Sequence, residues 1–416
     1  MSVPLCIQKY PLPFRKSIVV PWNDTVIAWG TGRGFSDFSA TYSVIYQHIQ
    51  GEWLRRETSG CVPDARIADK AAIHVVNDQM YVVGDTYYKT LDHNIEVHSL
   101  DIKTWTWKKL APKGKMPSIM SSGMSSWSYR GKLYFFGGLV FLEQPLTEDG
   151  CDYLSNTTMD LANFCGSLII GQVNQLFCYN IDNNTWEWPG QSGDIPSPRS
   201  GPSTIICDDN VFLFGGRNDK LHELVCFNDL HILDMEKMSW RKVHDTIEDV
   251  MVPSRHASHT FTRISQSHAI LFGSVYLLEN NRTVLKDDCW LLDLKKAKLQ
   301  EEPSSIWTRI RNHFPRKYHA AILEPISQRL WIMDGSIHSD SRLLKMTQNM
   351  LSLKEICLNW MNSFIHGDDA RLLPNEFPLQ LKNEIEVYRK KIAEAYWCNK
   401  EKGCTHCQRL HERGDP

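Results

Sequence analysis

The residue types best suited to metal binding lie near the C-terminal end of the chain. Cys398, Cys404, Cys407 and His411 bring thiols and an imidazole into a short stretch, and these are the ligand types of a structural zinc site. Only the last three have a spacing common in zinc sites, and the surrounding segment is short and polar. The alternative is a chain end with incidental cysteines. We therefore expect no resident metal and keep these four residues as the candidates.

Residue patterns typical of catalysis do not occur in the sequence. There is no nucleophile-elbow pattern G-x-S-x-G, no phosphate-binding loop and no dinucleotide-binding fingerprint. His259 and His319 follow Pro- and Arg-containing turns at similar places, which favours repeated structural histidines over ligands of a copper site. We expect a protein that is not an enzyme and that carries no cofactor.

An internal repeat accounts for most of the chain. An apolar run that ends in glycine recurs at residues 26–30, 80–84, 133–138, 211–216, 269–273 and 330–335. Two of these runs, those of residues 133–138 and 211–216, end in a Gly-Gly pair. The period of about fifty residues is that of kelch-type propeller blades, which have four strands each.

A tryptophan follows the second strand of most repeats and precedes a Pro-containing turn. These residues are Trp53, Trp107, Trp188, Trp240 and Trp307. A large aromatic side chain near the outer strand fills the wedge-shaped gap between neighbouring blades. Short apolar runs are typical of strands that are covered on both faces. We predict an all-β fold over residues 1–346, a six-bladed kelch β-propeller, followed by a helical tail over residues 347–416.

Two insertions interrupt the repeat, and we expect both to be loops on one face of the propeller. The longer covers residues 139–172 in the third blade and includes the apolar patch of residues 168–170. The shorter covers residues 218–227 at the equivalent place in the fourth blade. Long loops in compact folds are often functional, so the face that carries them is the candidate binding surface.

Composition limits the partners and the compartment. The formal net charge of −2 does not favour nucleic acid, and no apolar stretch approaches the length of a membrane span. The 12 cysteines are scattered rather than arranged as a disulfide framework. We expect an intracellular protein of the cytoplasm, the nucleus or both, with neither nucleic acid nor membrane as a partner.

The tail contains two helical patterns. Residues 352–361 have an apolar stripe and begin with Ser352 and Glu355 in the arrangement of a capping box. Leu353, Cys357 and Met361 in this segment resemble the BC box, through which substrate receptors bind the elongin B/elongin C adaptor. A leucine suits a pocket of the adaptor, and a cysteine is small enough for close helix approach. The alternative is a helix that packs its stripe against the propeller.

A second motif lies shortly after the first, ahead of the charged helical pattern of residues 382–397. Its anchor residues are similar to the cullin box that selects cullin-2; they are Leu373, Pro374, Phe377 and Leu381. Six blades followed by both boxes resemble the kelch-domain-containing substrate receptors of cullin-2 RING ubiquitin ligases. Some members of that family recognise degrons at protein C-termini, often ending in glycine.

The resemblance implies a binding site for a carboxylate. In those relatives an arginine just after the Gly-Gly pair of the fourth blade binds the terminal carboxylate of the degron, and Arg217 has that position here. A guanidinium suits this task because it donates two parallel hydrogen bonds. Lys220, Arg255, His256 and Lys317 are the further candidates for positive character around it.

Other pocket positions of the family differ in this chain. Leu139 replaces a tyrosine, Gly123 replaces a lysine, and His256 replaces a serine. A second arginine has no clear counterpart, and Lys220 and His222 are the candidates for it. The resemblance therefore implies the fold and the docking partners, while the preferred end of the degron stays open.

The sequence thus favours a substrate-recognition subunit of an elongin B/C–cullin-2 ubiquitin ligase that binds a peptide degron. The alternative is a kelch interaction scaffold with no connection to ubiquitin. A propeller enzyme is a third alternative.

Overall fold

The computed structural model describes most of the chain before residue 351. The described residues are 6–9, 14–33, 41–49, 52–64, 67, 71–85, 95–115, 117, 123–143, 159–165, 168–220, 223–245, 252–255, 259–277, 283–310, 320–323, 330–333 and 345–350. The chain divides into two compact units, one of residues Ser2–Asn349 and one of Met1 with Met350–Pro416. A strand crosses the boundary that was expected after residue 346, because β29 covers Lys345–Met350.

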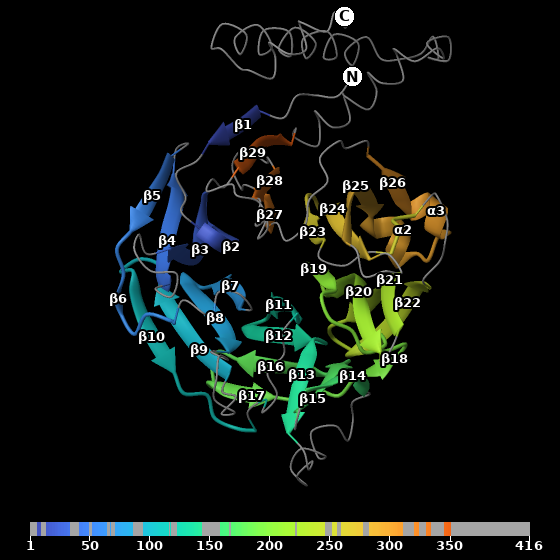
Figure 1. The fold of residues 1–416 in the computed structure, drawn as a ribbon, viewed down its shortest axis with the longest axis horizontal. Coiled ribbons are helices and arrows are strands. Elements are labelled where there is room, and N and C mark those ends of the chain that lie inside the picture. The colour runs from blue at the N-terminus through green and yellow to red at the C-terminus, as the bar shows by residue number, and fades with distance from the viewer. Residues whose placement is uncertain are drawn as a thin grey trace, which may run out of the picture. The chain divides into compact units, whose positions relative to one another are not determined.

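Five blades in the first unit each contain four antiparallel strands from successive parts of the chain, numbered from the centre outwards (Figure 1). Blade one contains β2 (Phe14–Trp22), β3 (Thr25–Arg33), β4 (Thr41–Ile49) and β5 (Glu52–Arg56). Blade two contains β7 (Ala72–Val76), β8 (Gln79–Asp85), β9 (Ile95–Asp101) and β10 (Thr106–Leu110). Blade three contains β11 (Ser125–Tyr129), β12 (Lys132–Phe136), β16 (Leu176–Asn180) and β17 (Thr185–Glu187). Blade four contains β19 (Ser203–Cys207), β20 (Asn210–Lys220), β21 (Glu223–Asp234) and β22 (Ser239–His244). Blade five contains β23 (Thr260–Arg263), β24 (His268–Leu277), β25 (Thr283–Asp293) and β26 (Trp307–Arg309).

A further sheet joins the two ends of this unit. Its strand order is β1 (Cys6–Lys9), β29, β28 (Leu330–Met333) and β27 (Ala320–Leu323). The innermost strands β2, β7, β11, β19, β23 and β27 contact one another in that order, and β27 contacts β2. The expected all-β propeller is therefore confirmed. Five blades each take their strands from one part of the chain, and the sheet β1-β29-β28-β27, which combines strands from both ends of the unit, closes the ring.

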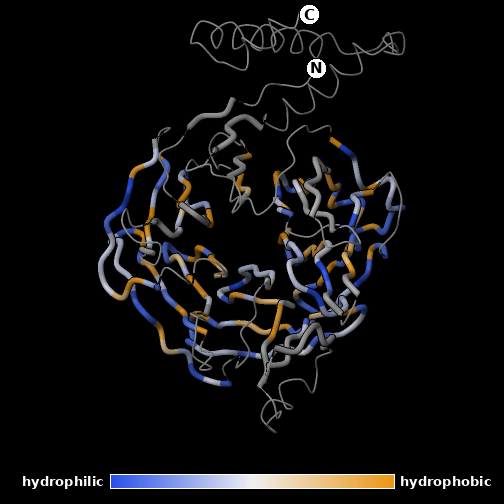
Figure 2. The backbone as a smooth tube through the Cα atoms, viewed as in Figure 1, coloured by the Kyte–Doolittle hydropathy of each residue, from blue (hydrophilic) through white to orange (hydrophobic). Residues whose placement is uncertain are grey.

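Tight turns explain why the inner strands form hairpins. Asn77 and Asp78 connect β7 to β8 with φ values of 50° and 62°, and Arg130 and Gly131 connect β11 to β12 with 44° and 74°. Two-residue turns with positive φ match the twist of antiparallel strands, and Asn, Asp and Gly tolerate that backbone best. In Figure 2 the hydrophilic colour follows much of the outer edge of the ring, and the hydrophobic colour gathers on the strands.

Buried tryptophans join neighbouring blades, as expected. The ring of Trp240 lies 5.0 Å from that of Phe136 in blade three, and Trp307 lies 5.2 Å from Phe214 in blade four. In blade three the residue at this position is Trp186, which is 4% exposed, rather than the expected Trp188. Trp186 lies in β17, whereas Trp188 follows the strand, so the predicted position of the tryptophan was wrong by two residues.

Short linking strands cover the outer edges of two blades. β6 (Ser59–Gly60) leaves blade one and pairs in parallel with β10, and β18 (Ser192–Gly193) leaves blade three and pairs in parallel with β22. Gly193 has φ +75°, and a Cβ there would lie 2.2 Å from the Trp240 carbonyl oxygen. Glycine is therefore required at this crossing between blades.

Both expected loops contain regular structure. The insertion of residues 139–172 forms β13 (Leu139–Glu143), β14 (Met159–Cys165) and β15 (Leu168–Val173), a three-stranded sheet of order β13-β15-β14. Residues 218–220 and 223–227 extend the β20–β21 ladder, with Asn218 paired to Val225 and Lys220 to Glu223. The expectation of loops was wrong, because the backbone N–H and C=O groups of both insertions are hydrogen bonded by strand pairing. β14 and β15 both contact β20, so the two insertions lie together, as expected.

Two short helices connect β25 to β26 at the edge of blade five. They are α2 (Leu294–Lys298) and α3 (Pro303–Ile306). The Asp293 carboxylate caps α2 by accepting from the backbone N–H groups of Lys295 and Lys296. Within the described part of the chain, no helix has the length and apolar character needed to cross a membrane.

Candidate functional site

The two Gly-Gly pairs of the repeat lie against one segment, residues 199–202, which leads into β19. A Cβ on Gly137 would come within 2.8 Å of the Arg199 carbonyl oxygen, and a Cβ on Gly216 within 3.0 Å of the Ser200 carbonyl oxygen. Backbone at this distance leaves no room for a side chain. The close approach requires one glycine of each pair, and the other two, Gly138 and Gly215, have positive φ values of 103° and 64°.

The backbone of Arg217 lies between two neighbouring segments, and both of its polar groups bond to one of them. The Ser200 N–H donates to the Arg217 carbonyl over 2.8 Å, and the Arg217 N–H donates to the Ser200 carbonyl over 2.9 Å. On its other side Arg217 pairs with Cys226 of β21. The neighbouring Asn218 donates its side-chain N–H to the Pro198 carbonyl over 2.8 Å. Arg217, which is partly buried, therefore starts from a fixed main chain.

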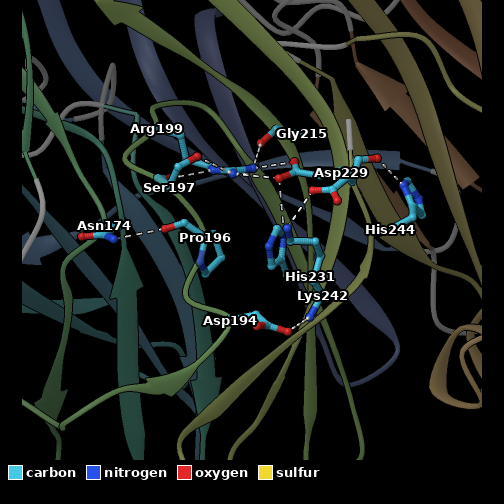
Figure 3. Close-up of polar contacts among 11 residues, drawn as sticks. Asn174, Asp194, Pro196, Ser197, Arg199, Gly215, Asp229, His231, Lys242 and His244 are labelled. Atoms are coloured by element: carbon cyan, nitrogen blue, oxygen red, sulfur yellow. Dashed lines mark hydrogen bonds and ion pairs between the residues drawn. The ribbon is translucent and has the colours of Figure 1, made fainter. Parts of the chain in front are cut away.

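Arg199 forms the most extensive polar contact of this region (Figure 3). Its Nη1 donates to the Gly215 carbonyl over 3.0 Å and to Asp229 Oδ1 over 2.7 Å. Its Nη2 donates to Asp229 Oδ2 over 2.9 Å and to Ser197 Oγ over 3.1 Å. Its Nε donates to the Ser197 carbonyl over 3.0 Å. All five N–H donors of a guanidinium are thereby used, so this arginine has none left for a ligand.

Burial and charge fix the protonation states beside this arginine. Burial opposes ionisation of Asp229, but the charge and hydrogen bonds of Arg199 hold the pKa of the carboxyl below its usual value. Burial lowers the pKa of His231 to about 4, although the Asp229 carboxylate 3.5 Å away opposes the change. At neutral pH the site therefore contains one charge pair and a neutral imidazole.

A second buried histidine connects blade four to blade five. His244 Nδ1 lies 2.9 Å from the Asp245 carbonyl oxygen, and its Nε2 lies 3.1 Å from Trp307 Nε1. An indole nitrogen can only donate, so Nε2 accepts and Nδ1 carries the proton. Burial lowers the pKa of His244, which agrees with this neutral form.

Comparison of the blades separates Arg217 from the arginines of the repeat. Arg199 and Arg255 each end a Pro-containing turn just before the innermost strand of a blade, so this position recurs. Arg217 stands two residues after the glycine that ends an apolar strand. In the sequence, the residues two positions after the corresponding glycine of blades one, two, three and five are Gly32, Thr86, Leu139 and Val275. A charged residue at a place the repeat does not require points to function rather than to folding.

The other binding residues expected from the sequence have different places. Lys220 ends β20 opposite Glu223, and its side chain lies outside the described residues. His256 and Lys317 also lie outside the described residues. Arg255 is partly buried and has the repeat position of Arg199, whose side chain is fully engaged.

Two altered pocket positions lie next to the segment that holds Arg217. The Gly201 N–H donates to the Gly123 carbonyl over 2.7 Å. The Gly138 N–H donates to the Arg199 carbonyl over 2.8 Å, and Leu139 follows directly at the start of β13. The backbone thus brings the Gly123 and Leu139 positions to the same segment as Arg217. Sequence reasoning missed Arg199 and Asp229, although the recurring Pro-x-Arg turn was a usable signal.

The described residues offer little support for catalysis or metal binding. Two contacts of 2.9 Å join a serine hydroxyl to an imidazole in the described part of the chain, one between the adjacent residues Ser267 and His268 and one between His74 Nε2 and Ser126 Oγ. Burial lowers the pKa of His74 to about 4, so its imidazole is a weak base. Among the described residues no group of three or more His, Cys, Asp or Glu could hold a metal ion.

The tail residues singled out from the sequence all lie outside the described residues. They are the elongin-docking candidates Leu353, Cys357 and Met361, the cullin-docking candidates Leu373, Pro374, Phe377 and Leu381, and the metal candidates Cys398, Cys404, Cys407 and His411. The helices expected over residues 352–361 and 382–397 lie there too. These assignments stay predictions.

Curated proteins of several names resemble the chain. Kelch domain-containing protein 1 of Mus musculus is 23% identical over 362 residues, which cover 82% of this chain and 82% of the relative. Kelch domain-containing protein 2 of Bos taurus is 25% identical and covers 55% of this chain. Acyl-CoA-binding domain-containing protein 4 of Arabidopsis thaliana is 25% identical over 82% of this chain. The match spans 47% of that plant relative's length, about half of it.

Solved structures and a family description agree on the fold. A structure titled "Structure of YjhT" superposes with a TM-score of 0.55 at 15% identity, covering 82% of this chain and 95% of its own. Kelch propellers are generally non-catalytic interaction modules. The family described as the KLHDC2/KLHL20/DRC7 Kelch-repeats domain matches residues 17–273 and 164–368, and the chain belongs to this family.

Proposed function

We propose that this chain is the substrate-recognition subunit of an elongin B/elongin C–cullin-2 ubiquitin ligase. In this proposal the propeller binds a peptide degron by its C-terminal carboxylate at the face that carries Arg217. The chain performs no covalent chemistry and needs no cofactor. It would work in the cytoplasm, the nucleus or both.

The observation that carries the binding site is the setting of Arg217. Its main chain is hydrogen bonded to Ser200 on one side and paired with Cys226 on the other. An arginine whose backbone is already ordered loses less entropy on binding, and its planar guanidinium matches a carboxylate with two parallel bonds. Since all N–H donors of Arg199 are used within the protein, Arg217 is the better candidate for binding the carboxylate of the degron.

The neighbouring positions support a pocket that differs from that of the relatives with glycine-ended degrons. Gly123 and Leu139 lie beside residues 199–201. A glycine where the family has a lysine removes a positive charge, and a leucine where it has a tyrosine removes a hydroxyl donor. The proposal therefore includes carboxylate capture but no preference for a glycine end.

The ligase connection is supported by the sequence of the tail. Two docking motifs in the order and spacing of the BC box and the cullin box follow the propeller. Short amphipathic helices with a few anchor side chains are a common way to bind a groove. Either motif alone occurs by chance, and their combination carries the assignment.

A pull-down with purified elongin B/elongin C tests this assignment. We expect the immobilised full chain to retain elongin C, and the double variant Leu353→Ser with Cys357→Phe to retain none while its propeller still unfolds at the wild-type temperature. Leu299→Ser is the matched control, because Leu299 is 74% exposed on the propeller. Wild-type protein that retains no elongin C contradicts the proposal.

The alternative is a kelch interaction scaffold unrelated to ubiquitin. It is favoured by the range of names among the relatives, which include acyl-CoA-binding domain-containing proteins and a host cell factor of Drosophila melanogaster. The same pull-down separates the two, because a scaffold of this kind has no reason to retain elongin C through Leu353 and Cys357.

A further inference from the structure

The ladder between β20 and β21 is broken at one place, between the blade and the extension that carries Arg217. Phe214 pairs with Leu230, but Gly216 pairs with Phe227. Gly215 therefore lies opposite two residues, Asn228 and Asp229. This is a β-bulge, which interrupts the ladder hydrogen bonds and lets a strand bend. The extension from Arg217 to Lys220 lies beyond it.

The Arg199 side chain occupies this break. It donates to the Gly215 carbonyl on β20 and to both carboxylate oxygens of Asp229 on β21, so it joins the two strands where their own ladder does not. Its guanidinium carbon also lies 4.2 Å from the centre of the Phe227 ring. Arg199 is 1% exposed, and such a desolvated, charge-assisted contact is strong.

The main chain next to Arg199 continues this connection. Ser200 exchanges two backbone hydrogen bonds with Arg217, and Asn218 donates to Pro198. The carbonyl of Arg199 itself accepts from Gly138 of blade three. The segment around Arg199 therefore ties the extension to its own blade and to the preceding one.

We propose that Arg199 is the positioning residue of the binding face: it fills the bulge and thereby fixes the direction in which Arg217 is presented. Arg199 does not contact the ligand, because its five N–H donors are all engaged within the protein. When the contacts of Arg199 are removed, Arg217 is still present, but the extension from Arg217 to Lys220 can move about the bulge. This inference rests on the proposed function, since it assigns Arg199 a part in carboxylate capture.

Blade five supports this reading because it repeats the combination. Its ladder shifts between Phe272 and Ser274, so that Gly273 lies at the break. Arg255 ends the Pro-containing turn before β23, as Arg199 ends the one before β19. We therefore read Arg255 as the corresponding positioning residue of blade five rather than as a ligand of the degron.

A double variant removes both charges of the pair. Gln175 of blade three has the position of Asp229, because Leu176 pairs with Phe136 as Leu230 pairs with Phe214. The double variant Arg199→Met with Asp229→Gln places an uncharged side chain at each position and leaves no buried unpaired charge. The matched control is Arg130→Met with Asp209→Gln, which removes an exposed Arg–Asp pair of 3.1 Å between the β11–β12 turn of blade three and the β19–β20 turn of blade four.

Hydrogen–deuterium exchange of the full chain tests the inference without a ligand. The amides of Ser200 and Arg217 should exchange about tenfold faster or more in the Arg199 double variant, because their mutual bonds open with the bulge. The amide of Trp240 in β22 should be unchanged, and the Arg130 control should leave all three as in the wild type. Unchanged exchange at Ser200 and Arg217 in the Arg199 variant overturns the inference.

A binding measurement adds a readout that stability alone does not move. A labelled peptide pool of random sequence with a free C-terminal carboxylate, compared with the same pool amidated, reports carboxylate capture. The Arg199 double variant should lose most of the preference for the free acid at an unchanged unfolding temperature, and a retained preference overturns the inference. Wild-type protein without any preference contradicts the proposed function instead, and the exchange experiment still decides the role of Arg199. If the double variant does not fold, Arg199→Lys is measured in the same way, with the same expected and contradicting results.

Discussion

Blade two and blade four have an acidic residue at the same point of the repeat, opposite the glycine that ends the second strand. In blade two the ladder is regular, with Gly84 paired to Glu96. Glu96 accepts from Lys109 over 2.6 Å and contacts His98 over 2.8 Å. These contacts lie within the blade, and the last pair of this ladder among the described residues is that of Asp85 and Ile95.

In blade four an extra residue sits at the equivalent place of the ladder. Asn228 and Asp229 together lie opposite Gly215, and the Asp229 carboxylate accepts from Arg199, which lies in the segment that leads into β19. The ladder then continues as an extension that carries Arg217. Glu96 thus contacts residues of its own blade. Asp229, beside the additional residue, instead connects the β20–β21 hairpin to the segment that contains Arg199. The repeat supplies the fold, and its local departures supply the candidate site.

The largest expected effect follows from removing Arg199 alone. Arg199→Ala leaves the Asp229 carboxylate buried without its partner, and breaking a buried ion pair in this way costs about 3–5 kcal/mol. We expect a loss of this size in the free energy of unfolding, measured by urea denaturation. Glu96→Gln in blade two is the comparison and should cost clearly less, because Glu96 is 18% exposed and its cationic partner Lys109 is 53% exposed. Equal losses in the two variants would remove the distinction between the blades.

Acid should weaken blade four through its buried imidazole. The pKa of His231 is about 4 in the folded protein, because burial disfavours the imidazolium, and near 6.5 when unfolded. Between these pH values the unfolded chain binds more protons than the folded protein. The contribution of His231 to the free energy of unfolding is therefore complete above pH 6.5 and is lost as the pH falls toward 4. This histidine contributes up to about 1.4 kcal/mol per pH unit in that window.

Denaturation of the wild type and of His231→Gln at several pH values measures this contribution. The variant should have the flatter dependence between pH 6.5 and 4. His74, whose pKa is also lowered to about 4 by burial, keeps part of the slope in both proteins. Identical slopes would show that His231 is protonated in the folded protein or accessible to water.

A smaller effect is expected where a linking strand crosses to the next blade. Gly193→Ala forces a side chain into positive φ and toward the Trp240 carbonyl oxygen, which should cost about 2 kcal/mol or more. Gly190→Ala is the control, since nothing lies within 4 Å of a Cβ at that position. Thermal unfolding of the two variants should differ by several degrees. A Gly193→Ala protein as stable as its control would mean that the linking strand can shift away.

Much of the propeller could be read from the sequence. The six apolar runs that end in glycine correspond to β3, β8, β12, β20, β24 and β28, because each repeat folds in the same local way. The insertion of residues 139–172 was misread as a loop. Its three strands pair across long separations, as Leu139 does with Gln172, and single-sequence patterns do not show which partner a strand has.

The candidate site was predicted only in part. Arg217 could be named because it follows a Gly-Gly pair, a local signal. The role of Arg199 depends on a bulge two strands away, and the turn that contains it reads in sequence only as a turn. Arg255 was named for its charge, whereas it ends a Pro-containing turn as Arg199 does, and Arg199 is engaged within the protein. Comparing equivalent positions between blades would have separated these two arginines from Arg217.

Carboxylate capture by Arg217 is tested directly by one measurement. Peptide pools of identical random sequence, one with a free C-terminal carboxylate and one amidated, are titrated into wild-type protein and Arg217→Ala. We predict that the wild type binds the free acid about tenfold more tightly or better, and that Arg217→Ala binds both pools alike. Equal binding of both pools by the wild type, or a preference that survives in Arg217→Ala, would contradict the account.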